Sequence, residues 1–376
     1  MKIGILGGGQ LAGLLAQEII RTDDTLVVLD PSDNCPASFM GANQIKGSPL
    51  SEKDIRRIAK EVDILTVEIE NVNTDILKVI ESEGLTILPK PETLEIIKNK
   101  LQQKSVFHKA GIPTCDFFSE TKRSVKCRDE LGWPLVQKAI QGGYDGRGVA
   151  IIEKDNSPSD WLSEPSYFEE FVPEAIELAI MVARDTKGNE RIWEPTQMEF
   201  DKKRNILSTL FSPPALEKKI IEEAKRISIK AVRSLEGIGL FGVELFLKDK
   251  TSLFVNEIAP RAHNSGHHSI DACETSQFRQ QYNILSNKPL TGTSAIFPTV
   301  MFNLLGEPGF EGKTNVEGEQ AASKIDGVFV HLYNKINCSP YRKMGHVTVV
   351  SERLEDAKEI ASKVRSLIRV RGDKKL

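Results

Sequence analysis

Short apolar segments alternate with helix-like segments over the first 90 residues of the chain. Residues 2–6 and 26–29 are apolar and predict buried strands, and the helical spacing of apolar side chains over 11–19 predicts the helix that joins them. The next predicted elements are a helix over 52–61, a strand over 64–68, a helix over 76–80 and a strand over 85–88. This alternation is typical of an α/β domain with a parallel sheet, which we expect to end beside two prolines near residue 90.

A glycine-rich turn over residues 7–9 joins the first strand to the first helix. The free N–H groups of a helix N-terminus suit a phosphate. The glycines, followed by Asp30 about twenty residues later, also resemble a dinucleotide fingerprint. Many α/β domains need a glycine turn here without binding a dinucleotide, so both interpretations stay open.

Two carboxylates and an amide end the strand at 64–68, in the run Glu68-Ile-Glu70-Asn71. In an open parallel sheet, ligands bind at the carboxyl ends of the strands. The alternation of side chains along a strand predicts that Glu68 and Glu70 point to the same side. The alternative is a solvated strand end.

A lysine lies within the apolar strand predicted over 133–139, and a glycine-rich loop follows it. Burying Lys138 is costly unless an anion meets it. Residues 142–148 include four glycines, and the backbone amides of such a loop can close over phosphate groups. A plain hairpin turn is the alternative, but the length of the loop, its arginine and the preceding lysine favour the phosphate role.

Two neighbouring antiparallel strands are predicted to carry one carboxylate each. Residues 240–247 form an apolar strand that contains Glu244, and after a short hairpin the returning strand ends at Asn256 and Glu257. Two buried carboxylates that face one site repel each other, and a hard cation relieves this repulsion. Glu244 and Glu257, with the Asn256 oxygen, therefore predict a Mg²⁺ site. The alternative is a buried pair without a metal, satisfied by Arg261.

The segment after this strand concentrates hydrogen-bond donors. Its polar side chains are Arg261, His263, Asn264, His267 and His268. Binding and catalytic residues are common in loops at strand ends, so we expect this loop to meet the ligands, with the alternative of a polar surface loop. We expect the histidines to orient ligands rather than to bind a transition metal, and which of them moves a proton stays open.

The last segment of the chain predicts a small α+β cap. Its predicted elements are strands at 296–305, 328–333 and 347–350 and a helix over 354–368. Lys335, Arg342 and Lys343 form a basic spot beside His331 and His346. The spot is either a solvated patch or an anion pocket shared with the loop after Glu257.

Composition narrows the class of protein. A chain of 376 residues predicts two or three domains, and 40% hydrophobic with 27% charged residues indicates a globular protein. The net charge of −3 gives no general attraction for nucleic acid or an anionic membrane. No apolar run has the length of a membrane helix, and the chain opens on a strand-like stretch rather than a signal-peptide pattern. Five scattered cysteines without CxxC spacing predict reduced thiols, so we expect a cytoplasmic protein.

Taken together and in this order, the motifs resemble the ATP-grasp superfamily and, within it, the N5-carboxyaminoimidazole ribonucleotide synthetases of purine biosynthesis. The motifs are Gly7-Gly-Gly-Gln-Leu11, Glu68-Ile-Glu-Asn71, Gly142-Gly-Tyr-Asp-Gly-Arg-Gly148, Asn256-Glu-Ile-Ala-Pro-Arg261, His263-Asn-Ser-Gly-His267 and Asp271-Ala-Cys-Glu-Thr-Ser-Gln-Phe278. The resemblance implies a mixed α/β and α+β fold with three domains. These would be a Rossmann-like domain (1–90), an ATP-grasp domain (91–290) with a mobile lid at about 114–173, and a small α+β cap (291–376).

The family resemblance also implies an activity and a set of roles. Members use ATP and Mg²⁺ to activate bicarbonate as carboxyphosphate and transfer the carboxyl group to 5-aminoimidazole ribonucleotide. ATP contacts would come from Lys100, Lys138, Gly142, Gly143, Tyr144, Asp145, Gly146, Arg147, Gly148, Glu169, Glu170, Phe171, Val172, Glu177, Asn256 and Glu257. The metal ligands would be Glu244 and Glu257, and the catalytic residues Arg261, His263, Asn264 and Lys138. The ribonucleotide would be bound by Gln10, Leu11, Glu70, Asn71, Lys335, Arg342 and Lys343. Relatives are often dimers, so the resemblance also implies a homodimer.

The chain departs from the family pattern at three places. Ala262 stands where the family commonly has the second proline of Pro-Arg-Pro-His, and Lys100 stands where relatives often have arginine. A histidine that the family often has near 196–200 is missing, with Gln197 and Glu199 as candidates to replace it. The alternative functions are a formate-dependent glycinamide ribonucleotide transformylase of the same superfamily, an NAD-dependent dehydrogenase and a nucleotide-sensing binding protein.

Overall fold

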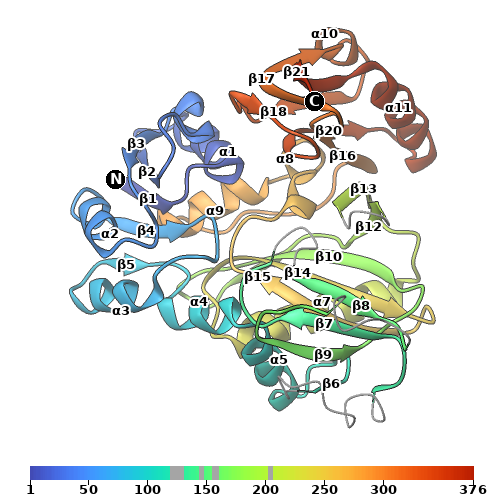
Figure 1. Cartoon of the computed structure of the whole chain (residues 1–376), viewed down its shortest axis with the longest axis horizontal. Helices are drawn as coiled ribbons and strands as arrows, with labels where there is room; N and C mark the ends of the chain where they lie inside the picture. Colours follow the sequence, from blue (N-terminus) through green and yellow to red (C-terminus); the bar gives the residue numbers. More distant parts are fainter. Residues whose placement is uncertain (119–130, 144–147, 155–160, 202–205) are drawn as a thin grey trace.

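The structure is a computed structural model that describes all residues except 119–130, 144–147, 155–160 and 202–205 (Figure 1). The chain forms an N-terminal α/β unit, a central unit that contributes to two β-sheets and a C-terminal α+β unit. This arrangement confirms the mixed α/β and α+β class predicted from the sequence.

A five-stranded parallel sheet organises the N-terminal unit, in the order β3-β2-β1-β4-β5. Its strands are β1 (Lys2–Leu6), β2 (Thr25–Asp30), β3 (Asn43–Lys46), β4 (Ile64–Val67) and β5 (Thr86–Ile87). Its helices are α1 (Gln10–Ile19), the 3₁₀ helix η1 (Pro36–Met40), α2 (Glu52–Ala59) and α3 (Thr74–Ser82). The short polar strand β3 was not predicted, because the sequence Asn-Gln-Ile-Lys has no apolar run.

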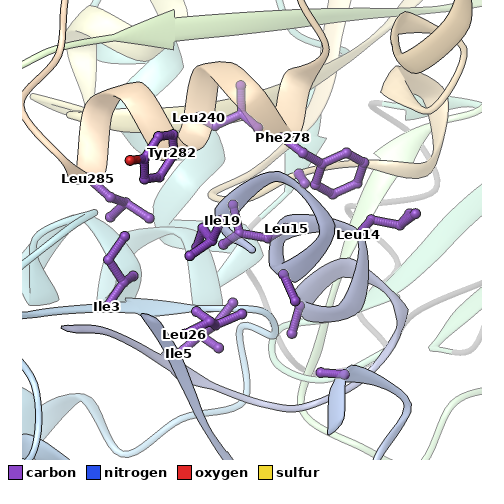
Figure 2. Close-up of a cluster of buried hydrophobic side chains, with 14 of the residues drawn as sticks. Ile3, Ile5, Leu14, Leu15, Ile19, Leu26, Leu240, Phe278, Tyr282 and Leu285 are labelled. Atoms are coloured by element: carbon purple, nitrogen blue, oxygen red, sulfur yellow. The ribbon is translucent and has the colours of Figure 1, made fainter. Parts of the chain in front are cut away.

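A shared apolar core joins the N-terminal unit to the central unit. Figure 2 shows Leu14, Leu15 and Ile19 of α1 between the strand residues below and the side chains of α9 (Gln277–Leu285) above. Phe278 and Tyr282 of α9 belong to the same buried cluster. Burial of this apolar surface fixes α9 against the N-terminal sheet.

Two helices and a four-stranded sheet open the central unit. The helices are α4 (Pro91–Lys98) and α5 (Lys100–Lys109), where Asn99 is extended and its side chain caps α5 by accepting from Gln102 N. The sheet has the order β6-β9-β7-β8. Its strands are β6 (Phe117–Phe118), β7 (Leu135–Ala139), β8 (Val149–Ile152) and β9 (Ser166–Glu170). The sequence also predicts a helix over 121–131, and this segment lies almost wholly outside the described residues.

A nine-stranded sheet runs from the central unit into the C-terminal unit, in the order β15-β14-β10-β12-β13-β16-β20-β18, with β11 beside β10. Its central strands are β10 (Ile176–Arg184), β11 (Glu190–Ile192), β12 (Thr196–Asp201), β13 (Ile206–Ser212), β14 (Gly239–Lys248) and β15 (Ser252–Ala259). Its C-terminal strands are β16 (Thr299–Leu305), β18 (Val328–Leu332) and β20 (Lys343–Val350). Helix α7 (Lys218–Ser234) packs on β10, β14 and β15. The pairing of β13 with β16 ties the two units together.

The C-terminal unit completes the fold with a three-stranded sheet in the order β19-β17-β21. Its remaining elements are β17 (Phe310–Glu317), α10 (Glu319–Ala322), β19 (Asn337–Cys338), α11 (Leu354–Leu367) and β21 (Arg369–Lys375). Helix α11 packs on β16 and β20. No helix within the described ranges is long and apolar enough to cross a membrane. The four cysteines that the structure describes are free and buried, and Cys127 lies outside the described residues.

Candidate active site

Two carboxylates face each other across the strand pair β14–β15. The antiparallel register pairs Glu244 with Glu257, which confirms that the two predicted carboxylates lie on adjacent strands, and a bulge follows Glu244. Burial and the neighbouring Glu257 charge raise the pKa of Glu244 above its ordinary value. Burial would also raise the pKa of Glu257, but the Lys100 ammonium, together with Lys138 and His263, outweighs it and lowers that pKa. The pair therefore carries the repulsion that a divalent cation relieves.

Two lysines contact the oxygen atoms of this pair and of its neighbour. Lys100, the first residue of α5, forms an ion pair with Glu257 Oε2. Lys138 Nζ on β7 donates to Asn256 Oδ1 at 2.7 Å. The residues assigned to ATP phosphate and those assigned to metal thus touch each other. The oxygen atoms of Glu244, Glu257 and Asn256 are hard ligands of the kind that Mg²⁺ takes together with substrate phosphates, so the residues fit that ion.

A buried carboxylate, that of Glu169, forms an ion pair with Lys138. Glu169 on β9 is 1% exposed, its Oε2 lies 2.9 Å from Lys138 Nζ, and its Oε1 accepts from Tyr167 OH at 2.7 Å. Lys104 Nζ, also buried, lies 3.2 Å from Glu169 Oε1. Burial would raise the pKa of Glu169, but Lys104 and Lys138 lower it to about 2. Glu169 in turn outweighs the effect of burial on Lys138 and raises the pKa of that lysine.

The family resemblance implied that Glu169, Glu170, Phe171 and Val172 form a hinge that meets the adenine of ATP, and Lys104 was not predicted as a site residue. The structure directs the Glu169 side chain at the two lysines, so an adenine contact at this residue would have to come from the backbone. The spacing of Lys100 and Lys104 could have indicated that Lys104 lies near the site, because residues four apart share one face of a helix such as α5.

The other predicted ATP contacts of this segment lie at the end of β9 and after it. Glu170 Oε1 pairs with Lys248 Nζ at 2.9 Å, and its backbone N–H donates to Asp116 O. Phe171 and Val172 are half-buried after the strand end. Glu177 lies on β10, and burial raises the pKa of its carboxyl to about 7, with Lys138 opposing the rise.

Glu177→Gln is expected to flatten the dependence of stability on pH. The folded protein keeps a proton on Glu177 up to about pH 7, whereas the unfolded chain releases it near the ordinary value, so stability falls as pH rises through that window. Removing the group should reduce this fall by about 2 kcal/mol between pH 5 and pH 8. Urea unfolding at both pH values measures it, with the exposed Glu61→Gln as control. Identical pH dependence in the variant and the wild type would contradict the assignment.

The glycine-rich loop starts and ends in backbone that favours glycine. Gly142, Gly143 and Gly148 have positive φ angles of 73°, 78° and 79°. A Cβ on Gly148 would lie 3.3 Å from Gly143 Cα, so the two ends of the loop pass close to each other. The other predicted loop residues, Tyr144, Asp145, Gly146 and Arg147, lie outside the described residues.

The loop after β15 joins the carboxylate pair to the N-terminal unit. Arg261 Nη2 lies 2.9 Å from Glu70 Oε1, and His263 Nε2 lies 3.4 Å from Glu244 Oε1. His263 fits against β14 because residue 242 is glycine, where a Cβ would lie 2.7 Å from His263 Cβ. Arg261 Nε and Asn264 Nδ2 are buried donors without a hydrogen-bond acceptor among the described residues. Buried donors usually have an acceptor, and the oxygen atoms of an anionic ligand are acceptors of that kind.

The glycine turn at the start of α1 is filled by a carboxylate of the protein itself. Glu68 accepts hydrogen bonds from Gly9 N at 2.5 Å, Leu11 N at 2.9 Å and Ala12 N at 3.2 Å. A Cβ on Gly9 would lie 2.6 Å from Glu68 Oε1. The side chain thus occupies the helix N-terminus where the pyrophosphate of a dinucleotide would bind, which argues against the dehydrogenase alternative.

The remaining predicted substrate residues of the N-terminal unit surround this turn. The strand alternation that predicted a shared side for Glu68 and Glu70 does not apply, because β4 ends at Val67; Glu68 enters the glycine turn and Glu70 reaches Arg261. Gln10 and Leu11 are half-buried at the start of α1, and Asn71 is exposed.

The basic spot of the C-terminal unit lies beside buried histidines. Lys335 Nζ donates to Lys343 O at 2.5 Å, and Arg342 Nη1 donates to Asn337 O at 2.6 Å. His331 stacks on His346 with ring centroids 4.5 Å apart, and the ring of His267 lies 4.8 Å from that of His346. The spot and the loop after β15 are therefore connected through packed imidazoles.

Three of these histidines are neutral by burial. Burial lowers the pKa values of His267, His268 and His346, because the interior disfavours the charged imidazolium. Among the described residues, no group of three or more His, Cys, Asp or Glu side chains could hold a metal ion. The rings act here as packed, hydrogen-bonded groups.

Three family models match consecutive parts of the chain. They are described as a ribonucleotide synthetase preATP-grasp domain (residues 1–98), an ATP-grasp domain (residues 105–278) and a phosphoribosylaminoimidazole carboxylase C-terminal domain (residues 299–360).

Individual relatives cover nearly the whole chain. The N5-carboxyaminoimidazole ribonucleotide synthase of Synechococcus elongatus is 31% identical over 97% of this chain and 95% of its own length. The crystal structure of N5-carboxyaminoimidazole ribonucleotide synthetase from Thermotoga maritima has 38% identity, a TM-score of 0.90 and 99% coverage of both chains. The Aspergillus clavatus synthase, solved with ADP and 5-aminoimidazole ribonucleotide, has 29% identity, a TM-score of 0.89 and 97% coverage of both chains.

Another group of curated relatives is longer than this chain. The chain spans about two thirds of the length of the phosphoribosylaminoimidazole carboxylases, for example 67% of the protein from Ogataea methanolica and 64% of that from Vigna aconitifolia.

Proposed function

This chain belongs to the N5-carboxyaminoimidazole ribonucleotide synthase family, which confirms the resemblance inferred from its motifs, and we propose that it performs the reaction for which that family is named. The reaction is the ATP- and bicarbonate-dependent carboxylation of 5-aminoimidazole ribonucleotide to N5-carboxyaminoimidazole ribonucleotide. The enzyme is an ATP-dependent carbon–nitrogen ligase of purine biosynthesis. The supporting observation is that Lys100 and Lys138 meet Glu257 and Asn256 next to the loop of Arg261 and His263.

The protein's own groups account for the two chemical steps. In the first step a bicarbonate oxygen attacks the γ-phosphorus of ATP, the bond to the bridging oxygen breaks and ADP leaves, giving carboxyphosphate. Lys100 and Lys138 would stabilise the charge that develops on the phosphate oxygens. Mg²⁺ held by Glu244, Glu257 and Asn256 Oδ1 would supply further neutralisation of that charge.

In the second step the 5-amino nitrogen forms a bond to the carboxyl carbon of carboxyphosphate, phosphate leaves and the nitrogen loses a proton. The buried donors Arg261 Nε and Asn264 Nδ2 would orient the carboxyl group. Gln10, Leu11, Glu70 and Asn71 would bind the ribonucleotide from the N-terminal unit, and Lys335, Arg342 and Lys343 would bind its phosphate. Glycines 142, 143 and 148 would let the loop close over ATP and exclude water from the short-lived carboxyphosphate.

ADP release is expected to reach its full rate only when ATP, bicarbonate and 5-aminoimidazole ribonucleotide are all present. A coupled assay with each component omitted in turn measures this dependence. ADP release that ignores the ribonucleotide over a wide concentration range would show that the substrate assignment is wrong, and formate-dependent phosphate release would favour the transformylase alternative.

The proposal extends to assembly and location. A cytoplasmic homodimer fits the family resemblance, in which relatives are often dimers. Sedimentation of the purified protein tests the dimer, and a monomer at micromolar concentration would contradict it.

A further inference from the structure

One buried glutamine holds the backbone of the predicted catalytic loop. Gln277, the first residue of α9, has no exposed surface. His263 N donates to Gln277 Oε1 at 2.9 Å, and Gln277 Nε2 donates to His263 O at 2.8 Å. The amide therefore satisfies both backbone groups of the same residue, as a neighbouring strand would.

The hydrogen-bond pattern fixes which way this amide points. Because Gln277 Oε1 accepts from a peptide N–H, the amide NH₂ is the group that faces His263 O. The second hydrogen of this NH₂ points to His267 Nδ1, and the two nitrogen atoms are 2.9 Å apart. His267 Nδ1 is then an acceptor and its proton lies on Nε2. Burial, which lowers the pKa of His267, keeps that ring neutral, as an acceptor requires.

The surroundings leave the amide no second position. A Cβ on Gly266 would lie 2.5 Å from Gln277 Oε1 and 2.7 Å from its Cδ, so the loop passes directly over the amide. Gln277 N donates to Ser269 Oγ, which itself donates to Gly266 O. The same helix is held against the N-terminal unit by the core of Figure 2 and by Arg279, whose Nη2 lies 2.7 Å from Glu18 Oε2.

We propose that Gln277 is a positioning residue for the reaction, because its amide sets where His263 and the donors of Arg261 and Asn264 lie relative to Glu244. Gln277 itself would touch neither ATP nor the ribonucleotide. It transmits the position of α9, and through it that of the N-terminal unit, to the loop that meets the metal-binding carboxylates. This role rests on the proposed function for the identity of the reaction, whereas the contacts of Gln277 with the loop do not depend on it.

The chain contains a matched control on the same helix. Gln280 has no exposed surface, and its amide makes the same pair of contacts with one backbone residue. Gln280 Nε2 donates to Thr291 O at 2.8 Å, and Thr291 N donates to Gln280 Oε1 at 3.1 Å. Thr291 is exposed and is not one of the predicted site residues. We call each of these paired amide–backbone contacts a clamp. Loss of the Gln280 clamp therefore removes equivalent hydrogen bonds at a place outside the predicted site.

The test compares Gln277→Met with Gln280→Met in the full chain. Hydrogen exchange of peptides covering 261–267 should rise at least tenfold in Gln277→Met and stay unchanged in Gln280→Met. In Gln277→Met, kcat should fall about 10–100-fold with KM for ATP within about twofold, because a displaced supporting group lowers activity by that order and the ATP lysines lie on other elements. Gln280→Met should keep kcat within about twofold at a similar loss of thermal stability.

Three outcomes would overturn the proposal: unchanged exchange over 261–267, an unchanged kcat in Gln277→Met, or an equal loss of kcat in Gln280→Met. If Gln277→Met does not fold, Gln277→Glu serves instead. Its carboxyl group can still accept from His263 N but lacks the two hydrogens that the amide donates to His263 O and His267 Nδ1, so we expect kcat to fall in the same range of about 10–100-fold, and an unchanged kcat in this variant would overturn the proposal. A wild-type protein without ribonucleotide-dependent ADP release would refute the proposed function, whereas the exchange comparison still tests the clamp itself.

Discussion

Glu257→Gln is expected to lower kcat by about 10³-fold or more and to leave the fold intact. A carboxylate at a metal site contributes several kcal/mol of stabilisation to the charge of the transition state, and each 1.4 kcal/mol corresponds to about tenfold in rate. The amide keeps the shape of the side chain but removes one of the two charges that face each other across β14 and β15. ADP release measures the rate, and circular dichroism checks the fold.

Glu194→Gln is the matched control for this substitution. Glu194 pairs with Lys225 at 2.6 Å outside the site, and its side chain is 37% exposed, as is that of Glu257. Both substitutions thus remove one lysine ion pair from a half-buried carboxylate of equal side-chain exposure, so the comparison separates the loss of an ion pair from the loss of the charge at the predicted metal site. Glu194→Gln should keep full activity. Activity of Glu257→Gln within about tenfold of the wild type would remove that glutamate from the metal site.

The carboxylate pair was predictable because it depends on local pattern. Glu244 and Glu257 lie on two strands joined by a tight hairpin, so the alternation of residues and the turn length nearly fix their register. Lys138 was predictable for a related reason, because a cation within an apolar strand must have a partner. The identity of that partner was not predictable, since Glu169 comes from a strand that pairs with β7 through residues 27 or more positions apart in the chain.

Long-range contacts explain the other differences between sequence and structure. The glycine turn at residues 7–9 resembled a nucleotide site because sequence spacing does not reveal that Glu68, from the next strand of the sheet, fills it. Nothing in the sequence around Gln277 indicates the contacts of its side chain, because its proposed role depends on the packing of α9 against the loop of His263. The fold class follows from periodicity, whereas such clamps depend on the tertiary packing that brings distant segments together.

Lys138→Met is expected to reduce kcat/KM for ATP by about 10²–10³-fold, the loss usual for one preorganised donor at a developing charge. Lys138 Nζ reaches both Asn256 Oδ1, beside the predicted metal ligands, and Glu169 Oε2, on the strand of the predicted ATP contacts. The loss of stability should be below the about 3–5 kcal/mol of a fully broken buried pair, because Lys104 and Tyr167 still contact Glu169. Kinetics at varied ATP and urea unfolding measure the two effects.

Lys104→Met separates the phosphate contact from the buried charge network. Lys104 pairs with the same Glu169 and is more deeply buried than Lys138, with side-chain exposures of 1% and 9%. Its ammonium donates to Val255 O rather than to Asn256. We therefore expect Lys104→Met to lose at least as much stability as Lys138→Met and to keep kcat/KM for ATP within about tenfold. Equal kinetic losses in the two variants would mean that Lys138 acts through the charge of Glu169 and not through ATP.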